Sequence, residues 1–406
     1  MEAPVVLIFC AVYAGMILGG LPLLQLDRTG VALLGAIAIV GTGALSPVQA
    51  AESVHLPTIL LLFSFMVIAA QLRLGGFYDW VTLKIAAAPL SPSLLLAGVI
   101  IAAGALSAVF SNDVVCLAVA PALIDACARR RLDPVPYLLG LACSANVGSA
   151  ATLIGNPQNM LIGQTLAIPF SAYLRHAAVP SLLGLAATWG VIAWQARGKW
   201  TSSAEVPSEA SAPPLDPWQT AKGLAVAAAL VAAFLLTGWP REVAALVGAG
   251  LLLSSRKLHS RQTLGLVDWG LLVLFIGLFV VNRAFEDTDL PRRVLDALGA
   301  RGVPLTAPAP LFVATFLLSN VVSNVPAVML LLPVAKDPGA PAYAGAMLAL
   351  VSTLAGNLLI VGSIANIIVV DAAAQRGIAI DWRRHARVGV PVTAVTLAIA
   401  AAWLVS

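Results

Sequence analysis

Long apolar runs, several of them about as long as a lipid bilayer is thick, dominate this sequence. A transmembrane helix needs roughly 20 apolar residues, and 60% of the 406 residues are hydrophobic while only 10% are charged. This composition excludes a soluble enzyme, a disordered chain and a nucleic-acid-binding protein. The net charge of +4 does not indicate a nucleic-acid partner either, because membrane proteins concentrate Lys and Arg in cytoplasmic loops. The sequence therefore predicts an all-α polytopic membrane protein surrounded by lipid.

Ten apolar runs qualify as membrane spans. The first run has no Lys or Arg before it, so we interpret it as a retained helix rather than a signal peptide. Two further apolar regions, 93–128 and 307–336, are interrupted at their centres by polar residues. The ten predicted spans cover residues 4–25, 30–47, 56–73, 137–166, 172–195, 218–237, 241–255, 267–285, 341–371 and 387–405.

A polar segment at residues 196–217 divides the chain into two apolar halves. It is rich in Ser, Pro, Ala and charge, which is typical of a solvated linker. If each interrupted region returns to the side from which it entered, 16 of the 23 Lys and Arg residues lie on one side of the membrane. The positive-inside bias assigns that side to the cytoplasm. We therefore predict a protein of the cytoplasmic (inner) membrane with a cytoplasmic linker and both termini outside.

Each half contains five predicted spans, and similar halves joined after an odd number of crossings must be inverted. The segments 107–121 and 319–333 support such a repeat, because Ser, Asn and Pro recur at matching positions. We predict two inverted repeats, each with five transmembrane helices, a re-entrant helical hairpin and a broken helix. The first repeat, 1–195, comprises scaffold helices in 1–73, a hairpin at 93–128 and a broken helix at 137–166; the second, 218–406, comprises scaffold helices in 218–285, a hairpin at 307–336 and a broken helix at 341–371.

The predicted hairpins place polar residues at membrane depth. The arms 309–322 and 326–334 would reach only about 21 and 14 Å at ~1.5 Å per residue, short of a ~30 Å hydrocarbon core. Polar or non-helical backbone survives at that depth only where it lines a cavity or is buried in protein. We expect the two tips to converge from opposite faces and to contact a solute, although simple capping of the turns is the alternative. The tip residues are Ser111, Asn112, Ser323 and Asn324.

The spans 137–166 and 341–371 are longer than one crossing needs and contain helix-breaking residues. Pro removes an amide, and Gly and Asn favour non-helical backbone. We interpret both spans as broken helices whose free ends face the hairpin tips and bind substrate or ion. Hydrogen bonding between helices, or plain packing for the small residues, is the alternative. The candidates are Asn146, Ser149, Thr152, Gly155, Asn156, Asn159, Asn357, Gly362, Ser363 and Asn366.

Asp113 is the one carboxylate that we place deep in the apolar phase. Intramembrane carboxylates are costly and usually functional, so Asp113 is our candidate for proton or cation coupling. The alternative is a loop residue near the cytoplasm, if the hairpin is shallow. We expect no resident cofactor and no metal site beyond a Na⁺ site. Because no ATP-binding or hydrolase motif is present, we predict no catalytic residues and no enzymatic activity.

Four segments together resemble the ion transporter superfamily, in its citrate-transporter-like and arsenite-permease-like branch. They read SNDVVCLAVAP, GSAATLIGNPQNMLIG, SNVVSNVPAVMLLLP and GNLLIVGSIAN. The resemblance implies two opposed hairpins, a homodimer and a transport part that moves elevator-fashion against a scaffold. Dicarboxylate symporters of this superfamily carry Ser-Asn-Thr at both tips, whereas this chain has Asp113 and Val325 at the third position. That departure favours the branch with arsenite permeases and sodium/proton antiporters over a dicarboxylate site.

We therefore predict a secondary active transporter for a small anion or oxyanion, coupled to Na⁺ or H⁺. The alternative within transport is arsenite or antimonite efflux, or sodium/proton antiport. A passive ion channel would need a continuous polar pathway, whereas the polar residues here cluster at mid-membrane points. A membrane scaffold or sensor would show no flux, and no loss when Asn112 or Asn324 is substituted.

Overall fold

The chain folds almost entirely into helices in the computed structural model, which describes residues 2–21, 24–201 and 214–405. Two short antiparallel strands, β1 (Gly20–Leu21) and β2 (Leu26–Asp27), are the exception, apart from an isolated bridge between Leu132 and Thr201. Most of the predicted linker, residues 202–213, lies outside the described residues. The all-α prediction is thus confirmed.

The first half of the chain contains ten α-helices within the described residues. Three of them, α3, α5 and α9, are shorter than the others. The helices are α1 (Glu2–Leu18), α2 (Arg28–Gly41), α3 (Pro47–Ser53), α4 (Leu56–Leu74), α5 (Phe77–Ala87), α6 (Pro92–Val109), α7 (Asn112–Arg129), α8 (Pro134–Ser149), α9 (Pro157–Thr165) and α10 (Phe170–Gln195).

The second half also contains ten α-helices among the described residues, and one 3-10 helix, η1 (Ile360–Gly362). Helices ten places apart share features: α7 and α17 each contain an internal Pro, as do α10 and α20. The helices are α11 (Pro217–Leu236), α12 (Arg241–Leu253), α13 (Ser260–Leu264), α14 (Trp269–Glu286), α15 (Leu290–Ala300), α16 (Pro308–Val322), α17 (Asn324–Lys336), α18 (Ala344–Ala355), α19 (Ile364–Gln375) and α20 (Trp382–Val405).

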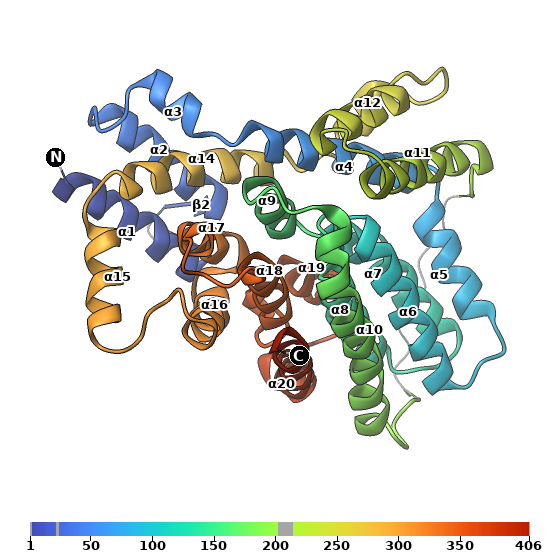
Figure 1. Ribbon diagram of the computed structural model, residues 1–406. Helices are drawn as coiled ribbons and strands as arrows, with labels where there is room; N and C mark the ends of the chain where they lie inside the picture. Colours follow the sequence, from blue (N-terminus) through green and yellow to red (C-terminus); the bar gives the residue numbers. More distant parts are fainter. Residues whose placement is uncertain (1, 22–23, 202–213, 406) are drawn as a thin grey trace.

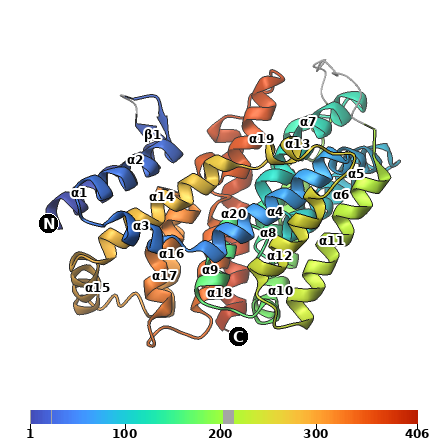
Figure 2. The same cartoon turned by 90° about the horizontal axis from the view of Figure 1, so that it is seen from above.

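The two halves pack on each other in exchanged pairs. Helix α2 packs on α14 and α12 packs on α4; likewise α7 packs on α19 and α17 packs on α9. Helices α1, α2 and α15 lie at one end of the molecule and α5, α6 and α11 at the other, with α9 and α18 between them (Figures 1 and 2). The two interrupted spans, α8–α9 and α18–α19, therefore meet near the middle of the structure.

Six of the described helices are long and apolar enough to cross a membrane: α4, α6, α10, α11, α14 and α20. Five of them coincide with predicted spans, while α6 was predicted as a hairpin arm. Over the predicted spans 4–25, 30–47 and 241–255 the helices are shorter, with 17, 14 and 13 residues. Apolar composition continues past the ends of α1 and α2, but Gly19 and Gly43 adopt positive φ there, so these two helices end where the backbone turns. Helix α12 ends at Leu253, just before the polar residues Ser254 and Ser255.

Close packing of α2 on α14 depends on a glycine. A Cβ added at Gly277 would lie 2.7 Å from the backbone carbonyl carbon of Ala32. This contact is too short, so backbone atoms would have to move to remove the clash. Overpacking of this kind costs about 1–3 kcal/mol. We expect Gly277→Ala to lower the midpoint of thermal unfolding in detergent. Gly190→Ala is the control, because a Cβ there meets no atom within 4 Å; equal midpoints for the two variants would contradict the packing argument.

Candidate functional site

The first polar tip lies between α6 and α7. Phe110 adopts an extended conformation that ends α6, and Ser111 precedes α7 without capping it through its side chain. Asn112 is buried, and its backbone N–H donates to the carbonyl of Gly155 over 3.2 Å. Its side-chain Nδ2 donates to Oδ1 of Asn146 over 2.9 Å. The tip is thereby attached to the first broken helix through both backbone and side chain.

The first break separates α8 from α9 over residues 150–156. Pro157 begins α9, and Asn156 caps it by accepting a hydrogen bond from the N–H of Asn159 over 2.9 Å. The amide of Asn156 also donates to Oγ of Ser149 over 3.0 Å. A Cβ at Gly155 would lie 2.3 Å from the carbonyl oxygen of Ser149, so the close approach of the two segments requires glycine. These bonds satisfy backbone and side-chain groups that a broken helix would otherwise leave unpaired.

Two more predicted residues stabilise this loop. Nδ2 of Asn159 donates to the carbonyl of Thr152 over 2.9 Å and to the hydroxyl of Tyr173 on α10 over 3.1 Å. The hydroxyl of Thr152 donates to the carbonyl of Ala108 at the end of α6. The loop is therefore held against both α10 and the first tip.

The second break separates α18 from α19 over residues 356–363 and contains η1. Nδ2 of Asn366 donates to the carbonyls of Gly356 and Leu359 over 2.8 and 3.0 Å. A side chain of the second helix thus pairs with the carbonyl at the C-cap of the first helix and with a carbonyl of the loop that follows it. Gly362 lies close to this turn, since a Cβ there would be 3.1 Å from the carbonyl oxygen of Gly356.

Asn146 on α8 joins the two breaks. Its Oδ1 accepts from Asn112 and also from the hydroxyl of Ser363 over 2.9 Å. Its Nδ2 donates to Oδ1 of Asn357 over 2.8 Å and to Oδ1 of Asn366 over 3.2 Å. Four bonds use the full hydrogen-bonding capacity of the amide. We call these five buried residues, Asn112, Asn146, Asn357, Ser363 and Asn366, the amide cluster.

The second polar tip approaches the same cluster from the side of α18. Ser323 separates α16 from α17 at φ 77°, a strained conformation for a residue other than glycine. Asn324 is buried beside Gly356, because a Cβ at that glycine would lie 3.1 Å from Nδ2 of Asn324. Gly356 in turn accepts a hydrogen bond from Asn366. Both tips therefore border the amide cluster, the first by direct hydrogen bonds and the second through the turn at Gly356.

Several buried polar atoms around the cluster have no hydrogen-bond partner in the described part of the chain. They include Oδ1 of Asn112, Oδ1 of Asn324 and Nδ2 of Asn357. Asp113 lies in the first turn of α7 with its side chain partly exposed, and within the described residues it forms no hydrogen bond or ion pair. The amide cluster and the second tip together thus offer two amide oxygens, one amide N–H group and a nearby carboxylate that other residues leave free.

Sequence reasoning missed four residues of this region: Gln158, Tyr173, Thr353 and His385. Oγ1 of Thr353 on α18 accepts from the amides of Asn156 and Gln158 over 3.2 and 3.1 Å. Tyr173 donates to the carbonyl of Ala150 over 2.7 Å. His385 on α20 is buried, and its Nε2 lies 3.0 Å from the carbonyl oxygen of Asn357. Thr353 could have been noticed as a polar residue in an otherwise apolar run. The residues with which it forms hydrogen bonds depend on the fold and could not be predicted from the sequence.

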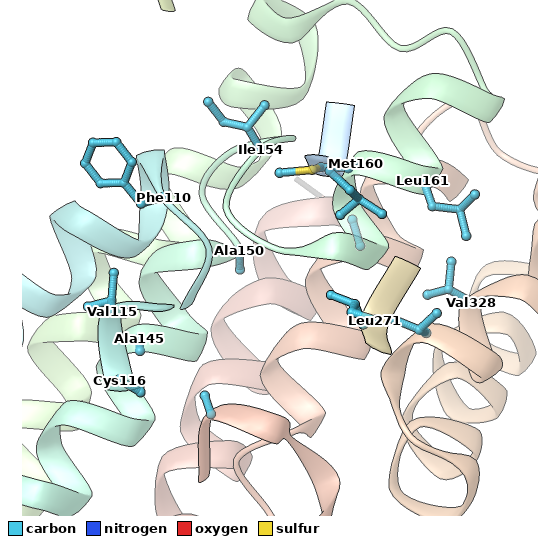
Figure 3. Close-up of a cluster of buried hydrophobic side chains, with 14 of the residues drawn as sticks. Phe110, Val115, Cys116, Ala145, Ala150, Ile154, Met160, Leu161, Leu271 and Val328 are labelled. Carbon is cyan, nitrogen blue, oxygen red and sulfur yellow. The ribbon is translucent and has the colours of Figure 1, made fainter. Parts of the chain in front are cut away.

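Apolar side chains enclose the first break. Figure 3 shows Phe110, Ala150 and Ile154 around the loop that precedes α9, with Leu161 of α9 facing Val328 of α17. In the described part of the chain, no three His, Cys, Asp or Glu side chains gather in a way that could hold a metal ion. Any cation at the amide cluster would be bound by amide, hydroxyl and carbonyl oxygens, the ligands that hard cations prefer.

A salt bridge also connects the two halves away from the cluster. Nη1 of Arg376, just after α19, lies 2.7 Å from Oδ1 of Asp125 on α7, and both side chains are less than 20% exposed. Truncating one partner of such a pair leaves a largely desolvated charge. The bridge fixes α7 relative to the end of α19.

Comparison with known proteins places the chain among membrane transporters. The sequence model of the family described as "Citrate transporter" matches residues 5–355. An uncharacterized transporter of Mycobacterium tuberculosis is 28% identical over 411 residues, which cover 94% of each chain. A silicon efflux transporter of Oryza sativa subsp. japonica is 28% identical over 448 residues, covering 93% of this chain and 92% of the relative.

A solved structure has the same overall fold. The crystal structure of the Alcanivorax borkumensis YdaH transporter matches with a TM-score of 0.57, covering 98% of this chain and 96% of that one. The sequence identity is 15%, so this likeness concerns the fold alone.

Removing the side chain at the centre of the amide cluster tests its structural role. Hydrogen bonds within membranes average about 0.6 kcal/mol each, so the loss of four in Asn146→Ala should lower the free energy of unfolding by about 2 kcal/mol. Thermal unfolding in detergent measures this. Asn282→Ala is the matched control, since that buried amide bonds Tyr13 outside the cluster. An Asn146→Ala variant as stable as wild type would show that the four bonds do not support the breaks.

Proposed function

Because the chain belongs to the citrate transporter family, we propose that it is a secondary active transporter that moves a small anion or oxyanion across the cytoplasmic membrane, coupled to Na⁺ or H⁺. One observation carries this proposal. Two helix breaks, one from each half, are joined at the amide cluster, and both polar tips border it. Broken helices that meet at one polar point are where secondary transporters bind substrates and coupling ions.

The chemistry of the cluster suits an anion and a cation together. Amide N–H groups and the first turns of α7, α9, α17 and α19 attract negative charge. The free oxygens of Asn112 and Asn324 are suitable ligands for Na⁺. We assign substrate or ion contact to the predicted set of residues: Ser111, Asn112, Asp113, Asn146, Ser149, Thr152, Gly155, Asn156, Asn159, Ser323, Asn324, Asn357, Gly362, Ser363 and Asn366.

The exchanged packing of the halves supports the proposal of two inverted repeats. A two-fold relation would convert the contact of α2 with α14 into that of α12 with α4, and the contact of α7 with α19 into that of α17 with α9. In our proposal the two hairpins and two broken helices move together, elevator-fashion, against the scaffold helices. We also propose that two copies of the chain assemble as a homodimer.

Two contacts support the way our proposal groups segments by membrane side, while the positive-inside bias assigns both termini to the outside. Asp125 and Arg376 pair between segments that we assign to the cytoplasmic side. Arg241 donates to the carbonyl of Gly163 over 2.7 Å between segments that we assign to the outer side. Each contact joins regions for which the positive-inside bias gives the same side.

Asp113 favours a second candidate within transport, namely arsenite or antimonite efflux or sodium/proton antiport. An acidic tip without an ion-pair partner in the described chain suits a proton or cation carrier. The silicon efflux relative also supports an inorganic substrate.

Flux measurements in proteoliposomes test the proposed function. A panel of citrate, silicate, arsenite and antimonite, each with an imposed Na⁺ or pH gradient, should reveal at least one substrate whose flux saturates and depends on a gradient. Linear flux that ignores both gradients would instead indicate a channel. A scaffold or sensor would be favoured by two results together. No panel member would show flux, and ligands would stabilise Asn112→Ala and Asn324→Ala against thermal unfolding as much as they stabilise wild type.

Substitution of Asp113 separates the coupling ions. In Asp113→Asn the side chain keeps its size but cannot carry a proton, so flux driven by a pH gradient should fall at least tenfold, about 1.4 kcal/mol of coupling. Flux is measured at several pH values with and without Na⁺. Asp289→Asn, at an exposed carboxylate before α15, is the control. An unchanged pH profile in Asp113→Asn would remove Asp113 as the proton carrier.

A further inference from the structure

A second polar cavity lies away from the amide cluster, at the junction of α8, α10 and α20. Its volume is about 640 Å³. The N-terminal parts of α8 and α20 and the C-terminal end of α10 form its walls. The charged lining residues are Asp133, Lys199, Arg384 and Arg387, and the aromatic one is Trp194.

Positive charge predominates in this cavity. Among the described residues, Lys199, Arg384 and Arg387 form no ion pair. Asp133 is the one acidic lining residue, and it caps α8 by accepting from the N–H of Val135 over 3.0 Å. Three cations therefore face one carboxylate, and the resulting excess of positive charge attracts an anion.

The walls of the cavity are fixed relative to each other. Nε2 of Gln195 on α10 donates to the carbonyl of Arg387 on α20 over 2.7 Å. Nη1 of Arg384 donates to the carbonyl of Ala379 over 2.9 Å, which orients the guanidinium and leaves its other N–H groups free. A preorganised set of donors binds an anion without first having to order flexible side chains.

The cavity lies at a boundary between polar and apolar surface. Trp194 on its rim and Trp382 at the start of α20 are each 67% exposed, as expected of tryptophans at a membrane interface. Beyond Arg387, the surface of α20 becomes apolar, with Val390 and Val395 exposed. An anion with hydrocarbon chains could place its charge in the cavity and its chains along this helix.

We propose that this cavity binds the phosphate headgroup of an anionic phospholipid. Arginine guanidinium groups match phosphate oxygens in geometry, and a basic pocket between transmembrane helices at the cytoplasmic side suits such a headgroup. The exposed apolar residues of α20 favour a lipid over free phosphate, because phosphate alone would make no use of them. The site is separate from the amide cluster and does not depend on the transported substrate.

Binding at this cavity also bears on the second helix break. His385, between Arg384 and Arg387 in sequence, contacts the carbonyl of Asn357, and a Cβ at Gly389 would lie 2.3 Å from the same oxygen. A lipid that holds the start of α20 in place therefore stabilises the contacts of His385 and Gly389 with the carbonyl of Asn357. This consequence, unlike the binding itself, rests on the proposed transport function.

The binding is tested with spin-labelled phosphatidylglycerol in phosphatidylcholine vesicles that contain the full-length protein. Electron paramagnetic resonance measures the fraction of label immobilised by the protein. The variant Lys199→Gln/Arg384→Gln/Arg387→Gln should bind the anionic lipid at least about fivefold more weakly relative to phosphatidylcholine. Arg256→Gln/Lys257→Gln/Arg261→Gln is the control, since it removes the same charge from exposed positions elsewhere and should bind as wild type does.

Two outcomes would overturn the proposal. Equal binding of phosphatidylglycerol by wild type and the cavity variant would show that the cavity is not the site. Complete displacement of the lipid by inorganic phosphate at millimolar concentration would assign the cavity to a free anion. Because lipid binding is read without any flux, a failure of transport in the same vesicles leaves this test intact.

Discussion

The requirement that every buried polar group find a partner in lipid shapes this structure more than any other constraint. A helix broken inside the membrane exposes amides and carbonyls that water cannot reach. In this chain the side chains of Asn159 and Asn366 pair with backbone carbonyls of the break in their own half. The side chain of Asn146 then links the two breaks across the interface between the halves.

The proposed site lies at this interface between the halves. Side chains that bond across an interface can exchange partners when the two sides move. The free oxygens of Asn112 and Asn324 border the interface, one on each polar tip. A solute or ion that supplies the missing partners would be bound between groups from both halves of the chain.

The positions of the breaks could be predicted from the sequence because polar residues are rare in it. Gly155-Asn156-Pro157 and Ser323-Asn324 stand out against apolar surroundings, and the helices end and begin at these residues. The central role of Asn146 could not be predicted in this way. It lies inside α8 and nothing local indicates that its amide meets Asn357 and Asn366, more than 200 residues later. The lengths of α1 and α2 were overestimated for a related reason, since apolar composition alone does not show where the backbone turns.

Access of water and solute to the two polar tips is the most direct measure of whether the cluster is a transport site. In a chain whose four native cysteines are replaced, Ser111→Cys and Ser323→Cys are labelled in turn with a membrane-impermeant thiol reagent, with and without a transported anion. Labelling from water that the anion slows at both positions is the predicted result. Two thiols that no aqueous reagent reaches from either side, or labelling rates that no solute alters, would contradict a site between the tips.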